Sequence, residues 1–187
     1  MNAFTKMDRE TFHRFAAEHP EQRFELERGR IVQQMTGGTA RHGVVALMIA
    51  QQLLTQLDRT TWRVSLDRGV GIGTSCRYPD VVTEPADEPL DSLETKRPSV
   101  IIEVLSPSSA GVDLNTKPGE YFSLASLDAY IVASQSEPAM LVWVRDADGQ
   151  FPESGQEISG MDQSISVKGR ALAFTLVLRD IYQGICS

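Results

Sequence analysis

The sequence has few cysteines, no long apolar run and no excess of basic residues, and each absence excludes a class of protein. Its two cysteines, Cys76 and Cys186, are far apart and have no closely spaced Cys or His beside them, so a disulfide framework and a zinc signature are both absent. No run reaches the length of a membrane span, and residues 1–14 lack the apolar core of a signal peptide. We therefore expect a cytoplasmic protein that has no membrane partner.

The acidic balance of the chain limits its partners. Eighteen Lys and Arg residues against 25 Asp and Glu residues give a formal net charge of −7, so binding to nucleic acid would need a local basic patch. The chain has 187 residues, of which 41% are hydrophobic, and this is enough for one full core but short for two. We predict a single domain over residues 1–187.

A β-branched run at residues 100–105 carries one carboxylate, Glu103, where a wholly apolar strand is expected. The run predicts a buried central strand. Burial of an unpaired carboxylate costs several kcal/mol, so Glu103 must be neutral, paired with a cation or bound to a metal. Upstream, Asp80 opens a second apolar stretch after Pro79, where it could also cap a turn. Two acids on neighbouring strands suggest a divalent-cation site.

The first part of the chain predicts a helix over residues 8–18 and two short strands within residues 23–32 that turn near Arg28-Gly29. In the strands, Glu25 and Glu27 share one face by the two-residue period, and a solvated face is the simpler interpretation. Both helix-associated histidines, His13 and His19, are predicted to be solvated.

A longer helix is predicted over residues 40–57, with Thr39 as its N-cap. Arg41 and His42 fall in its first turn, where backbone N–H groups and the helix dipole favour an anion, although a plain surface role is the alternative. The residues expected to face the core are Val44, Leu47, Met48, Leu54 and Leu57.

Residues 62–73 alternate well enough for a strand or hairpin, and their three glycines predict a relaxed strand or bulge rather than a dinucleotide loop. An exposed loop is predicted for residues 84–98. Beyond the central strand, Asp113, Lys117 and Tyr121 recur every four residues, with the regular helix expected from about 116 to 125. Further strands are predicted around residues 129–133, 139–144, 165–167 and 174–178.

The order Pro79-Asp80, then Glu103 on an apolar strand, then a nearby lysine resembles the PD-(D/E)XK, or restriction-endonuclease-like, nuclease superfamily. More narrowly, nearly the whole chain is similar to a bacterial family of restriction endonucleases. The narrower likeness rests on Arg23-Phe24-Glu25-Leu26, His42, Tyr78-Pro79-Asp80-Val81, Ile102-Glu103-Val104-Leu105-Ser106-Pro107-Ser108-Ser109, Asp113, Lys117 and Tyr121. The resemblance implies an α/β fold with a restriction-endonuclease-like core, in which helices flank a mixed central β-sheet.

The same resemblance implies a metal-dependent endonuclease that hydrolyses phosphodiester bonds in DNA. Asp80 and Glu103 would bind Mg²⁺ or Mn²⁺, and Lys117 would act on the attacking water. The superfamily places its lysine two residues after the acid, where this chain has Leu105, so the lysine must come from the following helix. Glu25 would complete the acidic cluster, and His42, Arg41 and Tyr121 would contact phosphate or support the metal ligands.

Three alternatives stay open. Glu103 and Lys117 could form a buried ion pair with no catalysis. The chain could be a catalytically silent nuclease-fold module that binds nucleic acid or a protein partner, as its net acidity and Leu105 suggest. It could also be a metal phosphohydrolase that acts on small molecules. We expect a homodimer, because a twofold dimer cuts both strands of a duplex more easily.

Overall fold

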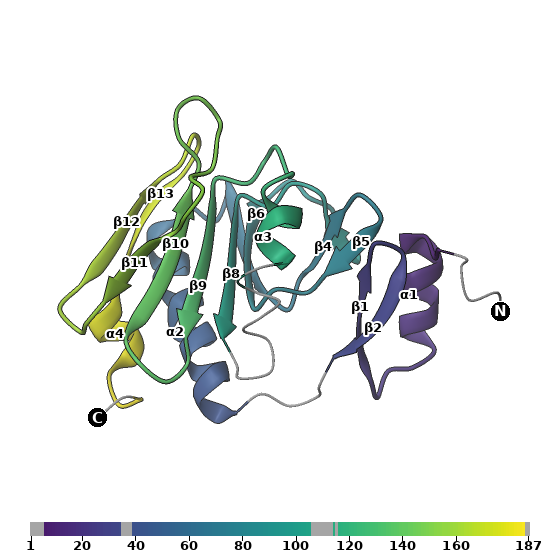
Figure 1. Ribbon diagram of the computed structural model, residues 1–187, viewed down its shortest axis with the longest axis horizontal. Coiled ribbons are helices and arrows are strands. Elements are labelled where there is room, and N and C mark those ends of the chain that lie inside the picture. The colour runs from purple at the N-terminus through teal and green to yellow at the C-terminus, as the bar shows by residue number, and fades with distance from the viewer. Residues whose placement is uncertain (1–5, 35–38, 106–113, 115, 186–187) are drawn as a thin grey trace.

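The computed structural model describes residues 6–34, 39–105, 114 and 116–185, and within them it has four helices and three β-sheets (Figure 1). The helices are α1 (Arg9–Ala17), α2 (Ala40–Gln56), α3 (Lys117–Tyr121) and α4 (Leu178–Tyr182). The strands are β1 (Arg23–Glu27), β2 (Arg30–Gln34), β3 (Trp62–Leu66), β4 (Gly69–Ile72), β5 (Ser75–Arg77), β6 (Val81–Pro85), β7 (Glu94–Thr95), β8 (Val100–Leu105), β9 (Ala129–Ser134), β10 (Ala139–Val144), β11 (Gln156–Ser159), β12 (Ser164–Lys168) and β13 (Ala173–Val177). The predicted α/β class, with mixed sheets flanked by helices, is confirmed. Asp113 lies outside the described residues.

Strand β8 lies inside a six-stranded sheet of order β11-β10-β9-β8-β6-β3. It runs parallel to β9 and antiparallel to β6. Its β-branched residues suit a strand that is covered on both faces, and every residue from Val100 to Val104 is buried. The predicted central strand is therefore confirmed.

A second sheet, of order β2-β1-β5-β4-β7, stands beside the first (Figure 1). Strand β3 pairs with β6 of the first sheet, whereas the next strand, β4, pairs with β5 and β7 of the second, so residues 62–73 do not form a hairpin. Helix α3 packs where the sheets meet, because its Tyr121 shares a core with Val70 of β4 and Ile101 of β8. The chain thus passes between the sheets on both sides of β4 and β5.

Helix α2 covers the opposite face of the six-stranded sheet and packs against β3, β8 and β13. Thr39 caps it as predicted, since its hydroxyl accepts the N–H of His42 at 3.2 Å. The predicted core face is wrong in three places, because Val44, Leu47 and Leu54 are 41%, 50% and 43% exposed. Apolar residues surround most of this helix, so periodicity alone did not select one face. The face that packs comprises Val45, Ala46, Ile49, Ala50, Leu53 and Leu57.

The remaining elements lie close to the predicted ones. Residues 84–98 contain the short strand β7, which pairs in parallel with β4, and are not a loop throughout. Helix α3 ends at Tyr121 rather than near residue 125, because the N–H groups of Ser123 and Leu124 bond three residues back, to Glu120 and Tyr121, instead of four. Strands β12 and β13 form a hairpin of their own beside α2 and α4. In the part of the chain described, no helix has the length and apolar content that crossing a membrane requires.

Candidate active site

Asp80 and Glu103 lie opposite each other at the ends of neighbouring strands. Val81 of β6 pairs with Ile102 of β8, so continuing this register by one residue sets Asp80 across from Glu103. Glu103 falls on the face away from α2, which also carries Ile101, whereas Asp80 precedes β6 and its side chain contacts His42 at the start of α2. One carboxylate oxygen of Asp80, Oδ2, accepts the N–H of Val104 at 2.6 Å. The structure therefore brings the two predicted acids together at one end of the sheet.

The lysine reaches Glu103 from α3. Lys117 is the first residue of this helix, followed by Pro118, which is tolerated there because the first turn needs no intrahelical N–H donor. Its Nζ donates to Oε1 of Glu103 at 2.7 Å, and the hydroxyl of Tyr121 donates to the same oxygen at 2.9 Å. All three side chains are buried. The displaced lysine expected from the sequence thus occupies the position beside the strand acid that Leu105 cannot fill.

Glu25 of β1 comes to the same group from the second sheet. Its Oε1 accepts the backbone N–H of Tyr78 at 3.2 Å and lies 3.9 Å from Nζ of Lys117. Its Oε2 accepts from Arg77 at 2.9 Å and from Gln34 at 3.1 Å. Glu25 is only 4% exposed, so the solvated strand face is the wrong interpretation for this residue.

Arg77 is a member of this group that sequence reasoning missed. It is 1% exposed and donates through Nη1 to Glu25 and through Nε to Glu120, at 2.9 and 2.8 Å. Burial by itself would lower the pKa of Arg77, but the hydrogen bonds and charges of Glu120 and Glu25 more than offset burial and raise it. The guanidinium is therefore a permanent cation that ties β5 to β1 and α3.

His42 and Arg41 behave differently although they are neighbours on α2. Nε2 of His42 is 2.9 Å from Oδ1 of Asp80, so this histidine holds the carboxylate oxygen that the Val104 N–H does not. Arg41 is exposed, and no ion pair or hydrogen bond joins it to the other predicted residues within the described chain.

Tyr121 is fully buried, and desolvation followed by the Glu103 charge raises its pKa well above the usual range. Tyr121 therefore lies behind Glu103 as a neutral hydrogen-bond donor.

The residues of this group fit a hard divalent cation. The group contains five carboxylates and three cations, which leaves a formal charge of −2; the carboxylates are those of Glu25, Glu27, Asp80, Glu103 and Glu120, and the cations are Arg28, Arg77 and Lys117. Their oxygens are the donors that Mg²⁺ prefers. Among the described residues, no three of these carboxylates converge to within 4.8 Å, but Mg²⁺ commonly uses one or two carboxylates and keeps several waters.

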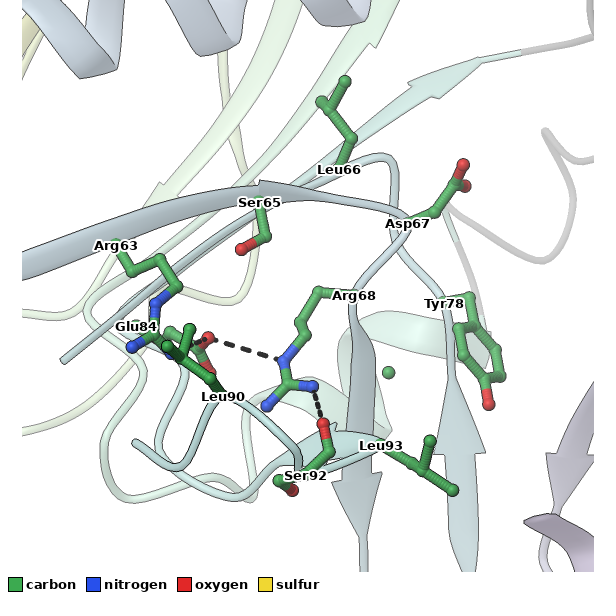
Figure 2. A pocket seen from close by; sticks show the side chains of 11 residues that line it. Arg63, Ser65, Leu66, Asp67, Arg68, Tyr78, Glu84, Leu90, Ser92 and Leu93 are labelled. Carbon is green, nitrogen blue, oxygen red and sulfur yellow. Dashed lines mark hydrogen bonds and ion pairs between the residues drawn. The ribbon is translucent and has the colours of Figure 1, made fainter. Parts of the chain in front are cut away.

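A surface pocket of about 360 Å³ lies elsewhere, between β3, β6 and the segment before β7 (Figure 2). Its floor is Glu84, a wholly buried carboxylate that lies 3.2 Å from Arg63 and 3.4 Å from Arg68. Arg68 also donates to the backbone oxygen of Ser92. None of the residues predicted to form the catalytic site lines this pocket. We interpret its charged residues as a buried ion-pair network that fastens residues 84–95 to the sheet.

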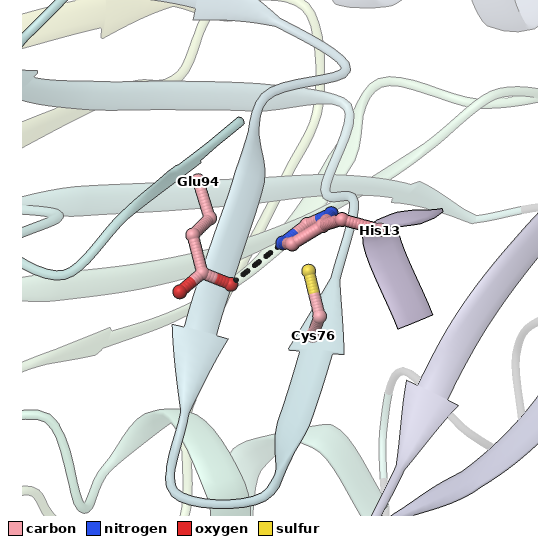
Figure 3. A group of neighbouring side chains, drawn as sticks. All are labelled: His13, Cys76 and Glu94. Carbon is pink, nitrogen blue, oxygen red and sulfur yellow. Dashed lines mark hydrogen bonds and ion pairs between the residues drawn. The ribbon is translucent and has the colours of Figure 1, made fainter. Parts of the chain in front are cut away.

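A second cluster was not predicted either. His13 is not a solvated helix residue, because its Nε2 lies 3.2 Å from Oε2 of Glu94 and its side chain is only 13% exposed. Cys76, His13 and Glu94 all meet within 4.8 Å (Figure 3). The sequence offered one signal for this cluster: Arg9 and His13 are four residues apart, so they share a helix face. In the structure both side chains contact the same carboxylate, that of Glu94.

Comparison with known proteins identifies the family and the fold of the chain. A family model named Uma2, described as "Putative restriction endonuclease", matches residues 9–174. The chain is 27% identical over 124 residues to the uncharacterized protein sll1609 of Synechocystis sp., covering 63% of this chain and 70% of that protein. A crystal structure of a putative nuclease belonging to DUF820 from Anabaena variabilis superposes with a TM-score of 0.67 at 15% identity, covering 88% of this chain and 92% of the other, and shows a shared fold. The protein, which carries Asp80, Glu103 and Lys117 on this fold, belongs to the Uma2 family.

Proposed function

We propose that this chain is an endodeoxyribonuclease that depends on Mg²⁺ or Mn²⁺, held by Asp80 and Glu103. The observation that carries the proposal is the position of Lys117, whose Nζ is 2.7 Å from Glu103, on the strand end that faces Asp80. A purely structural carboxylate on β8 would not need a second acid across from it. The family description and the shared nuclease fold support the same reaction class.

Each residue has a role in phosphodiester hydrolysis. A divalent cation at these carboxylates would supply positive charge to the phosphate and lower the pKa of a bound water. Lys117 would orient or deprotonate the attacking water and offset the phosphate charge. Glu25 lies 3.9 Å from Lys117 and would hold the amine between two carboxylates. Tyr121 would orient Glu103, His42 would orient Asp80, and Arg41, exposed on the first turn of α2, would contact the DNA backbone.

The test is plasmid nicking by the purified full chain at low salt with Mg²⁺, Mn²⁺ or EDTA. Asp80→Ala, Glu103→Ala and Lys117→Ala are compared with matched exposed controls, Asp148→Ala, Glu157→Ala and Lys168→Ala. We expect ion-dependent nicking that all three site variants lose by at least about 100-fold and the controls keep, because general base and metal ligand each contribute on that order. Circular dichroism establishes that each variant is folded.

The outcomes separate the assignments. Activity that survives in folded Lys117→Ala alone would keep the cation site and exclude Lys117 as the base. Turnover of nucleotides without cleavage of DNA or RNA would favour a phosphohydrolase of small molecules. Absence of any cleavage by folded wild-type protein would contradict the proposal.

A catalytically silent module is the second candidate, and one contact favours it. The 2.7 Å pair between Lys117 and Glu103 already satisfies both buried charges without a cation. A silent module predicts no Mn²⁺ binding that depends on Asp80. Titration of Mn²⁺ into wild type and Asp80→Ala, read by electron paramagnetic resonance, therefore distinguishes the two candidates without requiring cleavage.

We further propose that residues 1–187 act as one nuclease domain and that two copies form a homodimer, so that two centres reach the two strands of a duplex. The exposed side chains of Val44, Leu47 and Leu54 on α2 give one apolar surface on which a second copy could pack. Light scattering at the working concentration is the measurement. A monomer that nevertheless cuts both strands would contradict this assembly.

A further inference from the structure

His13, Cys76 and Glu94 form a cluster on the opposite face of the second sheet from the proposed nuclease centre. Arg77 of β5 points toward Glu25 and Glu120, so its neighbour Cys76 points the other way, toward α1. Cys76 is fully buried there in a small core with Phe12 and Leu26. The cluster is therefore separate from Asp80 and Glu103 and is closed off from bulk solvent on the Cys76 side.

The three side chains point toward one another from three elements (Figure 3). His13 comes from α1, Cys76 from β5 and Glu94 from β7, and one donor atom of each lies within 4.8 Å of the other two. Nε2 of His13 and Oε2 of Glu94 are 3.2 Å apart, close to the roughly 3.3 Å between two ligand atoms of a tetrahedral zinc site with bonds of about 2.0–2.1 Å. The arrangement thus needs little movement to accept an ion.

The donor chemistry selects the class of ion. One nitrogen, one sulfur and one oxygen are the ligand types that Zn²⁺ accepts together, whereas Mg²⁺ requires oxygen ligands. Cys76 is a buried free thiol, and a cation that binds its sulfur must replace the thiol proton, because the metal ligand is the thiolate.

The residues around the cluster hold Glu94 in place for such an ion. Nη1 of Arg9 is 3.1 Å from Oε1 of Glu94, which leaves Oε2 directed at His13. Gly71 provides the space, because a Cβ at that position would collide with the Arg9 guanidinium and lie 2.7 Å from Oε1 of Glu94. The absence of a side chain at Gly71 therefore lets Arg9 and Glu94 approach β4, on the side of the sheet away from the nuclease centre.

We propose that His13, Cys76 and Glu94 bind one Zn²⁺ ion, with water in the fourth position, as a clamp between α1, β5 and β7. The site joins residues that are 63 and 18 positions apart along the chain, so only the folded chain assembles it and the binding free energy of the ion adds to the stability of the fold. It does not depend on the nuclease proposal.

The test is cobalt titration of the EDTA-treated full chain in a Cys186→Ser background, which leaves Cys76 as the single thiol. We expect one equivalent of Co²⁺ to produce a thiolate-to-cobalt charge-transfer band and the d–d bands of a tetrahedral site, and Zn²⁺ to abolish both. Adding Cys76→Ser removes the charge-transfer band. His13→Gln, which keeps the thiol, weakens Co²⁺ binding, and Arg9→Gln weakens it by about 10–100-fold.

Two further measurements make the result decisive. Zn²⁺ raises the melting temperature of the metal-free chain but not that of His13→Gln. Asp80→Ala keeps the charge-transfer band, which distinguishes this site from the nuclease centre, whose proposed metal ligands are the carboxylates of Asp80 and Glu103. The proposal is overturned if folded wild-type protein shows no thiolate band at saturating Co²⁺, or if His13→Gln binds Co²⁺ and Zn²⁺ as tightly as wild type.

Discussion

Nζ of Lys117 lies 2.7 Å from Oε1 of Glu103 although fourteen positions separate the two residues in sequence. Both side chains are buried, and a buried charge is costly without a partner. Each residue therefore neutralises the charge of the other. The contact also brings the first turn of α3 to the end of β8. The same two residues therefore contribute to the stability of the fold and to the chemistry proposed for the site. A double-mutant cycle measures the coupling energy between them.

We expect Glu103→Gln and Lys117→Met each to lower the free energy of unfolding by about 3 kcal/mol, because each leaves a buried charge without its partner. The double variant should lose less than the sum of the two, with a coupling energy of about 1–3 kcal/mol. Urea denaturation of the four proteins gives the values. Additive losses would show that the pair is not an energetic unit.

Arg77 should be the more sensitive position. Arg77→Met leaves the carboxylates of Glu25 and Glu120 buried without their main cation, and we expect a loss of about 3–5 kcal/mol. Arg77→Lys should recover little, since one ammonium does not reproduce a guanidinium that donates to both acids. The control is Arg97→Met, an exposed ion-paired arginine whose loss should stay below about 1 kcal/mol. Equal denaturation midpoints for the two methionine variants would refute the assignment.

His42 is expected to act on metal affinity through Asp80. Its removal in His42→Ala frees Oδ1 of Asp80 to rotate, and we expect the dissociation constant for Mn²⁺ to rise by about 10–100-fold. His19→Ala is the matched control, because His19 contacts Phe15 and Phe24 and no predicted site residue. Isothermal titration at one pH provides the comparison. An unchanged Mn²⁺ affinity in His42→Ala would exclude this role.

Asp58 makes a pH-dependent contribution at the connection from α2 to β3. Hydrogen bonds from Thr60 and Thr61 lower the pKa of its carboxyl from the ordinary value of 3.8. Because the folded-state pKa lies below the unfolded one, the stabilisation is present above pH 3.8 and is lost as the pH falls through the lower folded value. Wild type should therefore melt above Asp58→Ala at pH 7, and the difference should vanish in strong acid. A difference that persists there would point to packing.

The sequence was sufficient for the features that depend on local pattern. A β-branched run with proline on both sides predicts a buried strand, and a strand of that kind forces an explanation of Glu103. The helix cap at Thr39 and the turn at Arg28-Gly29 follow from local chemistry, and both are present, with Arg28 and Gly29 at φ values of 49° and 82°. The spacing of four residues from Lys117 to Tyr121 correctly placed both on the Glu103 side of α3.

Features that depend on distant partners were not predictable. Arg77 lies on a three-residue strand, and its partners Glu25 and Glu120 are 52 and 43 positions away, so no local pattern marks it. His13 met Cys76 and Glu94 only because α1 packs on the second sheet. For α2, apolar residues on several faces made the core side undecidable until β3, β8 and β13 selected one. In each case the missing information was which elements pack against one another in the tertiary structure.

The chain crosses from one sheet to the other before β4 and returns after β5, and these crossings place the acidic group at the junction of the two sheets. Glu103 belongs to one sheet and Glu25 to the other, whereas Asp80 lies at the end of the second crossing and Lys117 is held between them by distances of 2.7 and 3.9 Å. A movement of one sheet relative to the other would therefore have to be accommodated at the contacts of Lys117, so this one amine ties the two sheets together.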